Sequence, residues 1–265
     1  MKKEMKAISM VLIISVVSLA VVLSGCTEEE KKNKIIVGTE ALFPPFEYVD
    51  EDGEITGFDI EMVTAILTDL GYEVEIKDMA FQQLIGAVQT GIIDVIAAGM
   101  TITDERLEQI SFSIPYYTSD QSVLVKSDST ITITNYSDFA DLTLGAQTGT
   151  TGALWVEEHL MNDTWLKEQN INYTLNITLD TYVSYTDAVQ DLRIGRIDAV
   201  IIDNPVGNAF AEEGATKVIY VISTNESFGL GVKKENTELL QKIDQALEDY
   251  MATEEWNNLV LKYFE

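Results

Sequence analysis

Two stretches of the 265-residue chain decide its fold because they share one pattern: AVQTGIIDVI at residues 87–96 and QDLRIGRIDAVI at residues 190–201. When Gly91 is laid on Gly195, the IDVI of the first stretch falls on the IDAV of the second. Each stretch predicts a helix that ends at its glycine, followed by a short buried strand. A single copy is also a common helix-to-strand junction, but its recurrence predicts two similar lobes.

The sequence outside this repeat also alternates strands with helices. The run IIVG at 35–38 predicts a buried strand, and GFDI at 57–60 opens a helix whose apolar residues recur at helical spacing up to Gly71. Residues 72–77 alternate apolar and polar types, which predicts another strand. The pattern therefore predicts an α/β protein of two lobes, each a mostly parallel sheet flanked by helices.

The first strand of the repeat runs into AGMTITDER at residues 98–106. Ligands of open α/β sheets bind beyond the carboxyl ends of strands, and small residues here let a ligand approach the backbone. Thr101 offers a hydroxyl, and Thr103 is a predicted helix cap. Arg106 lies at the start of that helix, where its charge opposes the macrodipole, so a ligand carboxylate is its expected partner. A surface Asp is the alternative partner.

The second strand of the repeat ends at Asp203, after four apolar residues. A carboxylate at the end of a buried strand needs a partner, which a ligand ammonium would supply. Turn formation by Asp-Asn-Pro at 203–205 explains the same residue equally well. Together, Arg106 and Asp203 match the two charges of an amino-acid zwitterion.

Three phenylalanines lie in loops or at helix starts, where core packing does not clearly require them. We assign Phe46 to the core, and Phe43 and Phe81 to the ligand. The stretch QTGTTG at 147–152 follows a further predicted strand and can open a helix with free N–H groups toward an anion. It has no Walker lysine, so nucleotide binding is only a weak alternative.

The chain is strongly acidic, with 44 Asp and Glu against 17 Lys and Arg and a formal net charge of −27. This charge repels phosphate backbones, so we expect no nucleic-acid partner. Solubility or concentrated salt explains such acidity as well as steering of cationic ligands does.

The N-terminus resembles a signal peptide with a lipobox. Three lysines among the first six residues precede an apolar run at 7–22, which LSGC at 23–26 closes. We expect a signal peptide at 1–25, a lipid on the Cys26 thiol and a polar tether at 26–34. The protein is then anchored at the outer face of the cytoplasmic membrane. An uncleaved signal anchor is the alternative, with the rest of the chain outside in either case.

Cysteine and histidine each occur once in the chain, as Cys26 and His159. A disulfide within the folded body, a Cys nucleophile, a Ser-His-Asp triad and a multi-histidine metal site therefore lack the residues they need. We expect no enzyme activity, metal or cofactor.

Several of these motifs together resemble those of the polar-amino-acid (family 3) solute-binding proteins of ABC importers. The resemblance covers residues 35–265 and rests on Gly38 to Phe46, GFDI at 57–60, Ala98 to Arg106, Gly149-Thr150-Thr151, and Gly195 to Val200 with Asp203. It implies a type II periplasmic binding protein fold. Lobe I would comprise residues 35–117 and 226–265, and lobe II residues 118–225. Two chain crossings, at 116–120 and 224–228, would form the hinge.

The same resemblance implies a free amino acid as ligand, an ABC permease as partner and a monomer. It makes Arg106 the clamp for the α-carboxylate and Asp203 the acceptor for the α-ammonium. Phe43 and Phe81 would sandwich the side chain. The residues implied in ligand binding are Glu40, Phe43, Phe81, Ala98, Gly99, Thr101, Arg106, Gln147, Thr150, Thr151 and Asp203.

The side chain of the ligand would meet Glu40 and Gln147, neither of which is basic. This favours arginine or lysine modestly over glutamine, and it disfavours glutamate and aspartate. Two other classes stay open on this fold: the ligand domain of a receptor system, and a dehydratase acting on small carboxylic acids.

Overall fold

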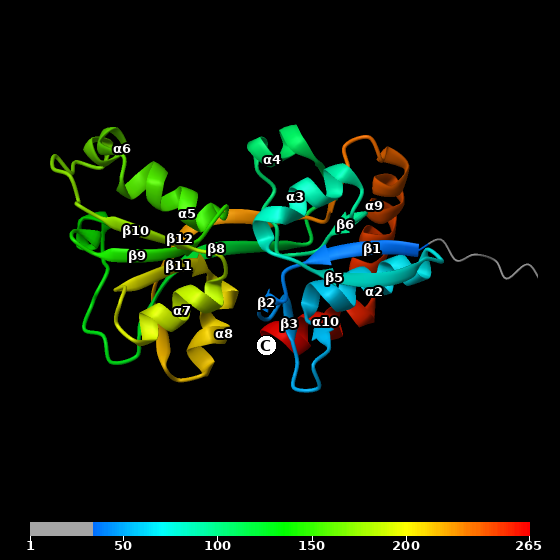
Figure 1. Cartoon of the computed structure of the whole chain (residues 1–265), viewed down its shortest axis with the longest axis horizontal. Helices are drawn as coiled ribbons and strands as arrows, with labels where there is room; N and C mark the ends of the chain where they lie inside the picture. The colour runs from blue at the N-terminus through cyan, green and yellow to red at the C-terminus, as the bar shows by residue number, and fades with distance from the viewer. Residues whose placement is uncertain (1–33) are drawn as a thin grey trace, which may run out of the picture. The chain divides into compact units, whose positions relative to one another are not determined.

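The computed structural model describes residues 34–265 and contains two five-stranded sheets (Figure 1). The first has the order β5 (Glu73–Asp78), β1 (Lys34–Thr39), β6 (Val95–Ile96), β13 (Gly231–Val232), β7 (Ser111–Phe112). The second has the order β10 (Thr178–Tyr182), β9 (Thr143–Gln147), β11 (Ala199–Asp203), β8 (Tyr117–Lys126), β12 (Thr216–Phe228). A small third sheet joins β2 (Leu42–Phe43), β3 (Glu47–Val49) and β4 (Ile55–Thr56).

The two large sheets follow one plan. In each, three parallel strands are continued by two antiparallel ones. The predicted α/β class with parallel strands is confirmed, and the antiparallel half of each sheet is an addition to it. No periodicity could reveal β7 and β13, because each has only two residues.

Helices accompany both sheets. Those of the first sheet are α2 (Phe58–Asp69), α3 (Phe81–Thr90), α4 (Asp104–Gln109), α9 (Thr237–Met251) and α10 (Glu254–Phe264). Those of the second are α5 (Thr151–Trp155), α6 (Asp163–Glu168), α7 (Tyr185–Arg193) and α8 (Asn204–Glu212), with a 3₁₀ turn at Tyr136–Phe139 and a π-helix at Val156–Leu160. None of the helices within residues 34–265 has the length and hydropathy needed to cross a membrane.

The sequence repeat is confirmed as two copies of one structural unit. In the first copy α3 ends at Thr90, directly before Gly91, and in the second α7 ends at Arg193, two residues before Gly195. Both glycines have positive φ, 74° and 75°, which lets the chain turn from helix into strand. The strands that follow are β6 and β11, and each is the central strand of its five-stranded sheet.

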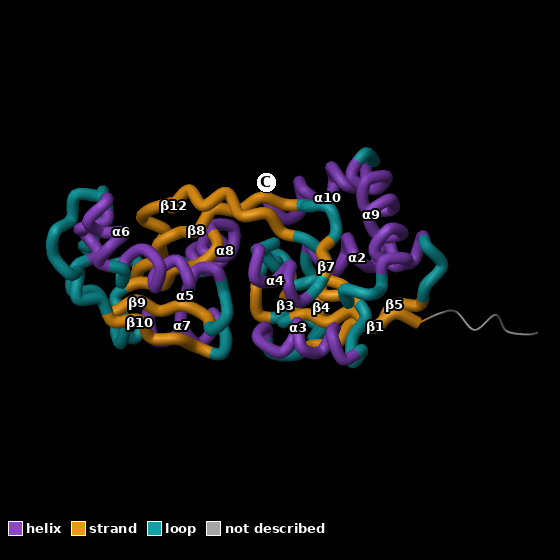
Figure 2. Tube along the Cα trace, turned by 90° about the horizontal axis from the view of Figure 1, so that it is seen from above, coloured by secondary structure: helices purple, strands orange, loops and turns teal. Residues whose placement is uncertain are grey.

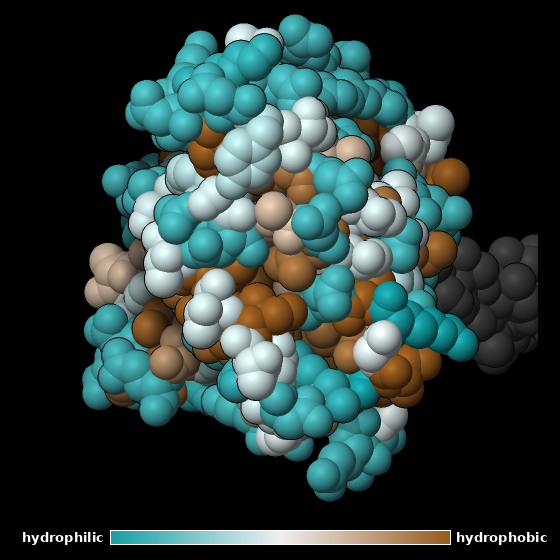
Figure 3. Space-filling view, turned by 90° about the vertical axis from the view of Figure 1, so that its left-hand side faces the viewer, coloured by the Kyte–Doolittle hydropathy of each residue, from teal (hydrophilic) through white to brown (hydrophobic). Residues whose placement is uncertain are grey.

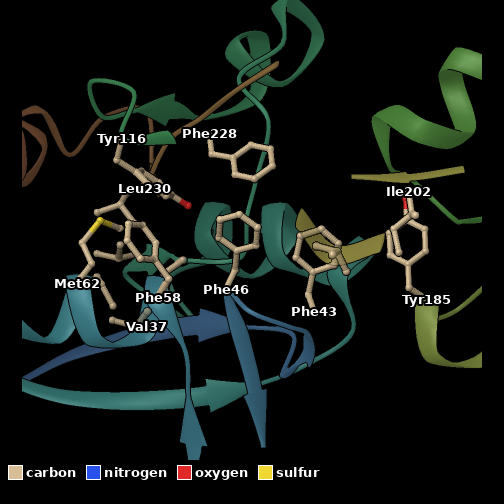
Figure 4. Packing of buried hydrophobic residues seen from close by; sticks show 14 of the residues in the cluster. Val37, Phe43, Phe46, Phe58, Met62, Tyr116, Tyr185, Ile202, Phe228 and Leu230 are labelled. Atoms are coloured by element: carbon tan, nitrogen blue, oxygen red, sulfur yellow. The ribbon is translucent and has the colours of Figure 1, made fainter. Parts of the chain in front are cut away.

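Each large sheet has a hydrophobic core. In the core near the first sheet, Phe46 packs between Phe58 and Phe228 (Figure 4). Phe46 is fully buried, as its assignment to the core predicts. The same cluster includes Val200 and Ile202 of the second sheet, whereas the alternate residue Ile201 belongs to a separate cluster with Trp155 and Phe139. Figure 3 looks onto the end of the molecule that carries this sheet, where hydrophilic residues surround scattered hydrophobic ones.

The strands β8 and β12 lie side by side and lead from the second sheet toward the first (Figure 2). Their ends pair Tyr117 with Phe228 and Ser119 with Glu226. Both predicted crossings, 116–120 and 224–228, fall on these paired ends. The lobe boundaries near residues 117 and 226 stay a prediction. The predicted signal peptide, Cys26 and nearly all of the tether lie outside the described residues.

Candidate functional site

One pocket brings together all the residues that the family resemblance implies in ligand binding. It is lined by Glu40, Phe43, Phe81, Ala98, Gly99, Thr101, Arg106, Gln147, Thr150, Thr151 and Asp203, and by one further residue, Glu47. Phe43 reaches toward Tyr185 of α7, with ring centroids 5.7 Å apart (Figure 4). The pocket is therefore built from both halves of the described chain, the half around the first five-stranded sheet and the half around the second.

Arg106 is held in the pocket by its own helix. The Thr103 hydroxyl accepts a hydrogen bond from the Arg106 backbone N–H, which confirms the predicted cap of α4. The guanidinium donates to the carbonyls of Thr101, at 2.7 Å, and Gly149, at 3.0 Å, and lies 5.4 Å from the centre of the Phe81 ring. Arg106 is 7% exposed, and burial lowers its pKa. A guanidinium has five N–H donors, so donors remain for a ligand anion.

The alternative partner for Arg106, a surface Asp, is not found among the described residues. Their ion pairs, defined by N···O distances within 4.0 Å, do not include Arg106. Carboxylates of Glu226 and Asp203 still act on it at longer range and favour its charged form.

Asp203 ends β11 inside the pocket and is 4% exposed. Its Oδ1 has no hydrogen-bond partner within residues 34–265. Burial raises the pKa of Asp203 to about 8, and the nearby Glu226 carboxylate contributes to the rise. The side chain does not cap α8, although Asp203 precedes that helix. Its geometry leaves an acceptor oxygen free for a cation, which the turn interpretation does not require.

Glu40 and Gln147 meet each other directly. The Gln147 Nε2 donates to Glu40 Oε2 at 2.6 Å and to the Val183 carbonyl at 2.8 Å. Glu40 is 5% exposed, and burial raises its pKa. This contact joins the loop after β1 to the end of β9, so it ties the two halves together at the edge of the pocket.

Glu47 is the pocket residue that the sequence interpretation missed. It lies on β3 opposite Phe43, is 1% exposed, and its Oε2 has no partner within the described chain. Burial raises its pKa well above the ordinary value, and the neighbouring acids Asp59, Glu40 and Asp203 add to this. The available signal was a charged residue that directly follows a buried phenylalanine in FPPFEYV at 43–49.

Asp59 and Gly99 together shape one wall of the pocket. Asp59 Oδ2 accepts hydrogen bonds from the Gly99 N–H, at 2.8 Å, and from the Tyr116 hydroxyl, at 2.5 Å. Gly99 has φ 49°, and a Cβ there would lie 2.7 Å from Phe43 Cε1, so only glycine suits this position. Asp59 therefore fixes the backbone that forms one wall.

No group of three or more His, Cys, Asp and Glu side chains within residues 34–265 is arranged to hold a metal ion. The pocket instead combines one guanidinium with three buried carboxyl groups and two phenylalanine rings. Such a mixture suits a small organic zwitterion that has an apolar stem and carries excess positive charge.

Residues 35–265 match the model of the bacterial extracellular solute-binding proteins, family 3. The chain belongs to this family. It is 30% identical over 266 residues to the arginine-binding extracellular protein ArtP of Bacillus subtilis (strain 168). The alignment covers 98% of each chain. The resemblance inferred from the motifs is therefore confirmed.

Solved structures of amino-acid-binding proteins show the same fold. An ancestral arginine-binding protein bound to arginine aligns with a TM-score of 0.79 at 35% identity, covering 88% of this chain and 99% of that one. An ancestral arginine-binding protein bound to glutamine aligns with a TM-score of 0.76, also at 35% identity, covering 88% and 98%. This family 3 chain has the two-lobed α/β fold of amino-acid-binding proteins.

Proposed function

We propose that this protein is the substrate-binding component of an ABC importer and that it binds a free amino acid with a cationic side chain, arginine before lysine. One observation carries the proposal: three carboxyl groups and a single guanidinium line the same pocket. Membership of a solute-binding family and the arginine-binding relatives support it.

The α-carboxylate and the α-ammonium of the ligand pair with two of these groups, Arg106 and Asp203. Its α-carboxylate takes the free donors of Arg106, and its α-ammonium takes the unpartnered Oδ1 of Asp203. The ammonium lowers the raised pKa of Asp203, so this carboxyl group is ionised in the complex.

The remaining carboxyl groups, Glu40 and Glu47, then face the ligand's side chain. A guanidinium between Phe43 and Phe81 gains cation–π stabilisation, on the order of 0.5–2 kcal/mol, and supplies donors to both acids. An acidic side chain would be buried beside two acids with no cation to pair with it, which costs several kcal/mol. Selectivity for a cation follows from this surplus of carboxyl groups.

Glutamine is the second candidate, and one contact favours it. The hydrogen bond from Gln147 to Glu40 is an amide-to-carboxylate pair inside the pocket, and a ligand amide can make the same bond. The relative solved with glutamine shows that an arginine-binding protein accepts this ligand. Calorimetry with arginine, lysine, glutamine and glutamate tests the proposal. We expect affinity to decrease in that order, and glutamate bound as tightly as arginine would contradict it.

The proposal includes a place in the cell. A lipid on Cys26 would hold the protein at the outer face of the cytoplasmic membrane, beside its permease, where it would act as a monomer. The lipobox-like LSGC at 23–26 supports this anchoring, and so does membership of an extracellular family.

A further inference from the structure

Behind the ligand pocket lies a carboxylate, that of Glu226, which the proposed ligand contacts do not use. Glu226 is half-buried near the end of β12 and lines a separate open groove. Thr101 and Thr151 line both the ligand pocket and this groove. The two threonines therefore stand between Glu226 and the ligand.

Glu226 accepts hydrogen bonds from groups in both halves of the molecule. Its Oε2 accepts from Thr101 Oγ1, at 2.8 Å, and from Thr151 Oγ1. Its Oε1 accepts from Gln121 Nε2, at 3.1 Å. Thr101 follows β6 of the first sheet, whereas Thr151 begins α5 beside the second sheet. One carboxylate on the connecting strand thus holds a hydroxyl from each half.

These bonds also fix the direction of two hydrogen atoms. A threonine hydroxyl has one hydrogen to donate, and an ionised carboxylate can only accept. Both hydroxyls donate their hydrogen to Glu226, so toward any other group they can only accept, as Thr151 Oγ1 does from Gln121 Nε2 at 3.5 Å. The Asp203 carboxylate offers acceptors in the same pocket. Together these acceptors form a set that suits an ammonium group.

We propose that Glu226 is a positioning residue that latches the two halves in the closed form and holds the hydroxyls of Thr101 and Thr151 as acceptors for the ligand's ammonium. This proposal rests on the proposed function only in that the ligand must be an amino acid. Since every amino acid carries the same ammonium, the latch does not depend on which side chain is preferred.

Glu226→Gln is the informative variant because it keeps the size but gives the side chain an N–H₂ group. Both hydroxyls donate to the same oxygen of Glu226, so an amide can hold them only with weaker, uncharged hydrogen bonds, and its N–H₂ group then faces the donor Nε2 of Gln121. We expect the affinity for arginine to fall about tenfold, roughly 1.4 kcal/mol. Most of the loss should appear as faster dissociation, because the ligand leaves only when the two halves separate and the latch opposes that separation. Affinities for lysine and glutamine should fall by the same factor.

Glu158→Gln is the matched control. Glu158 lines the same groove and is exposed, and the substitution removes the same charge. Equal losses in the two variants would overturn the latch, as would a change in the arginine-to-glutamine ratio in Glu226→Gln. Thr101→Val gives a second test, because the losses of Thr101→Val and Glu226→Gln should not add in the double variant. Fully additive losses would also overturn it.

The two proposals fail in different ways. If the wild type prefers an amino acid that is not cationic, the proposed selectivity fails, and the latch is tested with that amino acid instead. If no amino acid binds, the proposed function fails altogether. Ligand-free X-ray scattering then decides the latch: Glu226→Gln should have a larger radius of gyration than the wild type and Glu158→Gln, and an unchanged radius overturns it.

Discussion

Gln147 donates a 2.6 Å hydrogen bond to Glu40, a residue 107 positions earlier in the chain, and the two meet at the edge of the ligand pocket. This contact links the loop after β1 to the end of β9. It also places an acid where the ligand's side chain is expected, next to Glu47. In the proposed function, this carboxyl group therefore both joins the two segments and faces the ligand's side chain.

The Arg106 guanidinium should be essential for binding any amino acid. Charge-assisted hydrogen bonds contribute about 1.5–3 kcal/mol each, so Arg106→Ala should lower affinity at least a hundredfold. Arg106→Lys keeps the charge but loses the planar fork, and it should recover only part of the loss. Calorimetry measures both variants. An Arg106→Lys affinity equal to that of the wild type would show that the fork is not used.

Glu47 should set the preference for a cationic side chain. Glu47→Gln removes a carboxyl group from the pocket without changing its size, so affinity for arginine should fall about tenfold while affinity for glutamine changes little. The ratio of the two affinities, measured by calorimetry, is the readout. If arginine and glutamine lose affinity equally, Glu47 supports the pocket but does not select the ligand.

Stability of the ligand-free protein should fall as pH rises. Burial raises the pKa of Asp59 from its ordinary 3.8 to about 7, so the folded state holds a proton that the unfolded chain releases within this range. The free energy of unfolding therefore falls as pH rises from about 4 to 7, and Asp59 causes no further change above pH 7. Asp203, with a pKa of about 8, extends the decline by one further pH unit.

Urea denaturation at pH 5 and pH 8 measures how much the free energy of unfolding falls between these two values. Asp59→Asn cannot take up the proton and should make this fall smaller, whereas the exposed Glu158→Gln should leave it as in the wild type. An equal fall in all three proteins would mean that Asp59 does not contribute to it.

Lipid attachment should depend on Cys26. Cys26→Ser should release the protein from the membrane fraction, because the thiol that carries the lipid is absent. Mass spectrometry of the wild-type N-terminus provides the direct measurement. An unmodified N-terminus at any other residue would refute anchoring at Cys26.

The sequence predicted those parts of the site that rest on local patterns. The cap of Thr103 places Arg106, and the glycine-to-strand repeat places Gly99 and Asp203. Each is determined within a few neighbouring residues, by helix and strand chemistry that a sequence displays.

The missed residues depend on contacts between distant segments. Glu226 reaches Thr101 across 125 positions, through the register of β8 against β12, which has irregularities that no periodicity shows. Glu47 is buried because β3 pairs with β2, a strand of only two residues. The Glu40 to Gln147 bond was missed for the same reason: both were expected to face the ligand, not each other.

The surplus of carboxyl groups over the single guanidinium in the pocket should select a cationic amino acid, and competition calorimetry measures this selectivity. Purified protein saturated with glutamine is titrated with arginine, and protein saturated with arginine is titrated with glutamate. We expect arginine to displace glutamine and glutamate not to displace arginine. Displacement of arginine by glutamate would contradict this, because it would show that Glu40 and Glu47 do not act on the ligand's side chain.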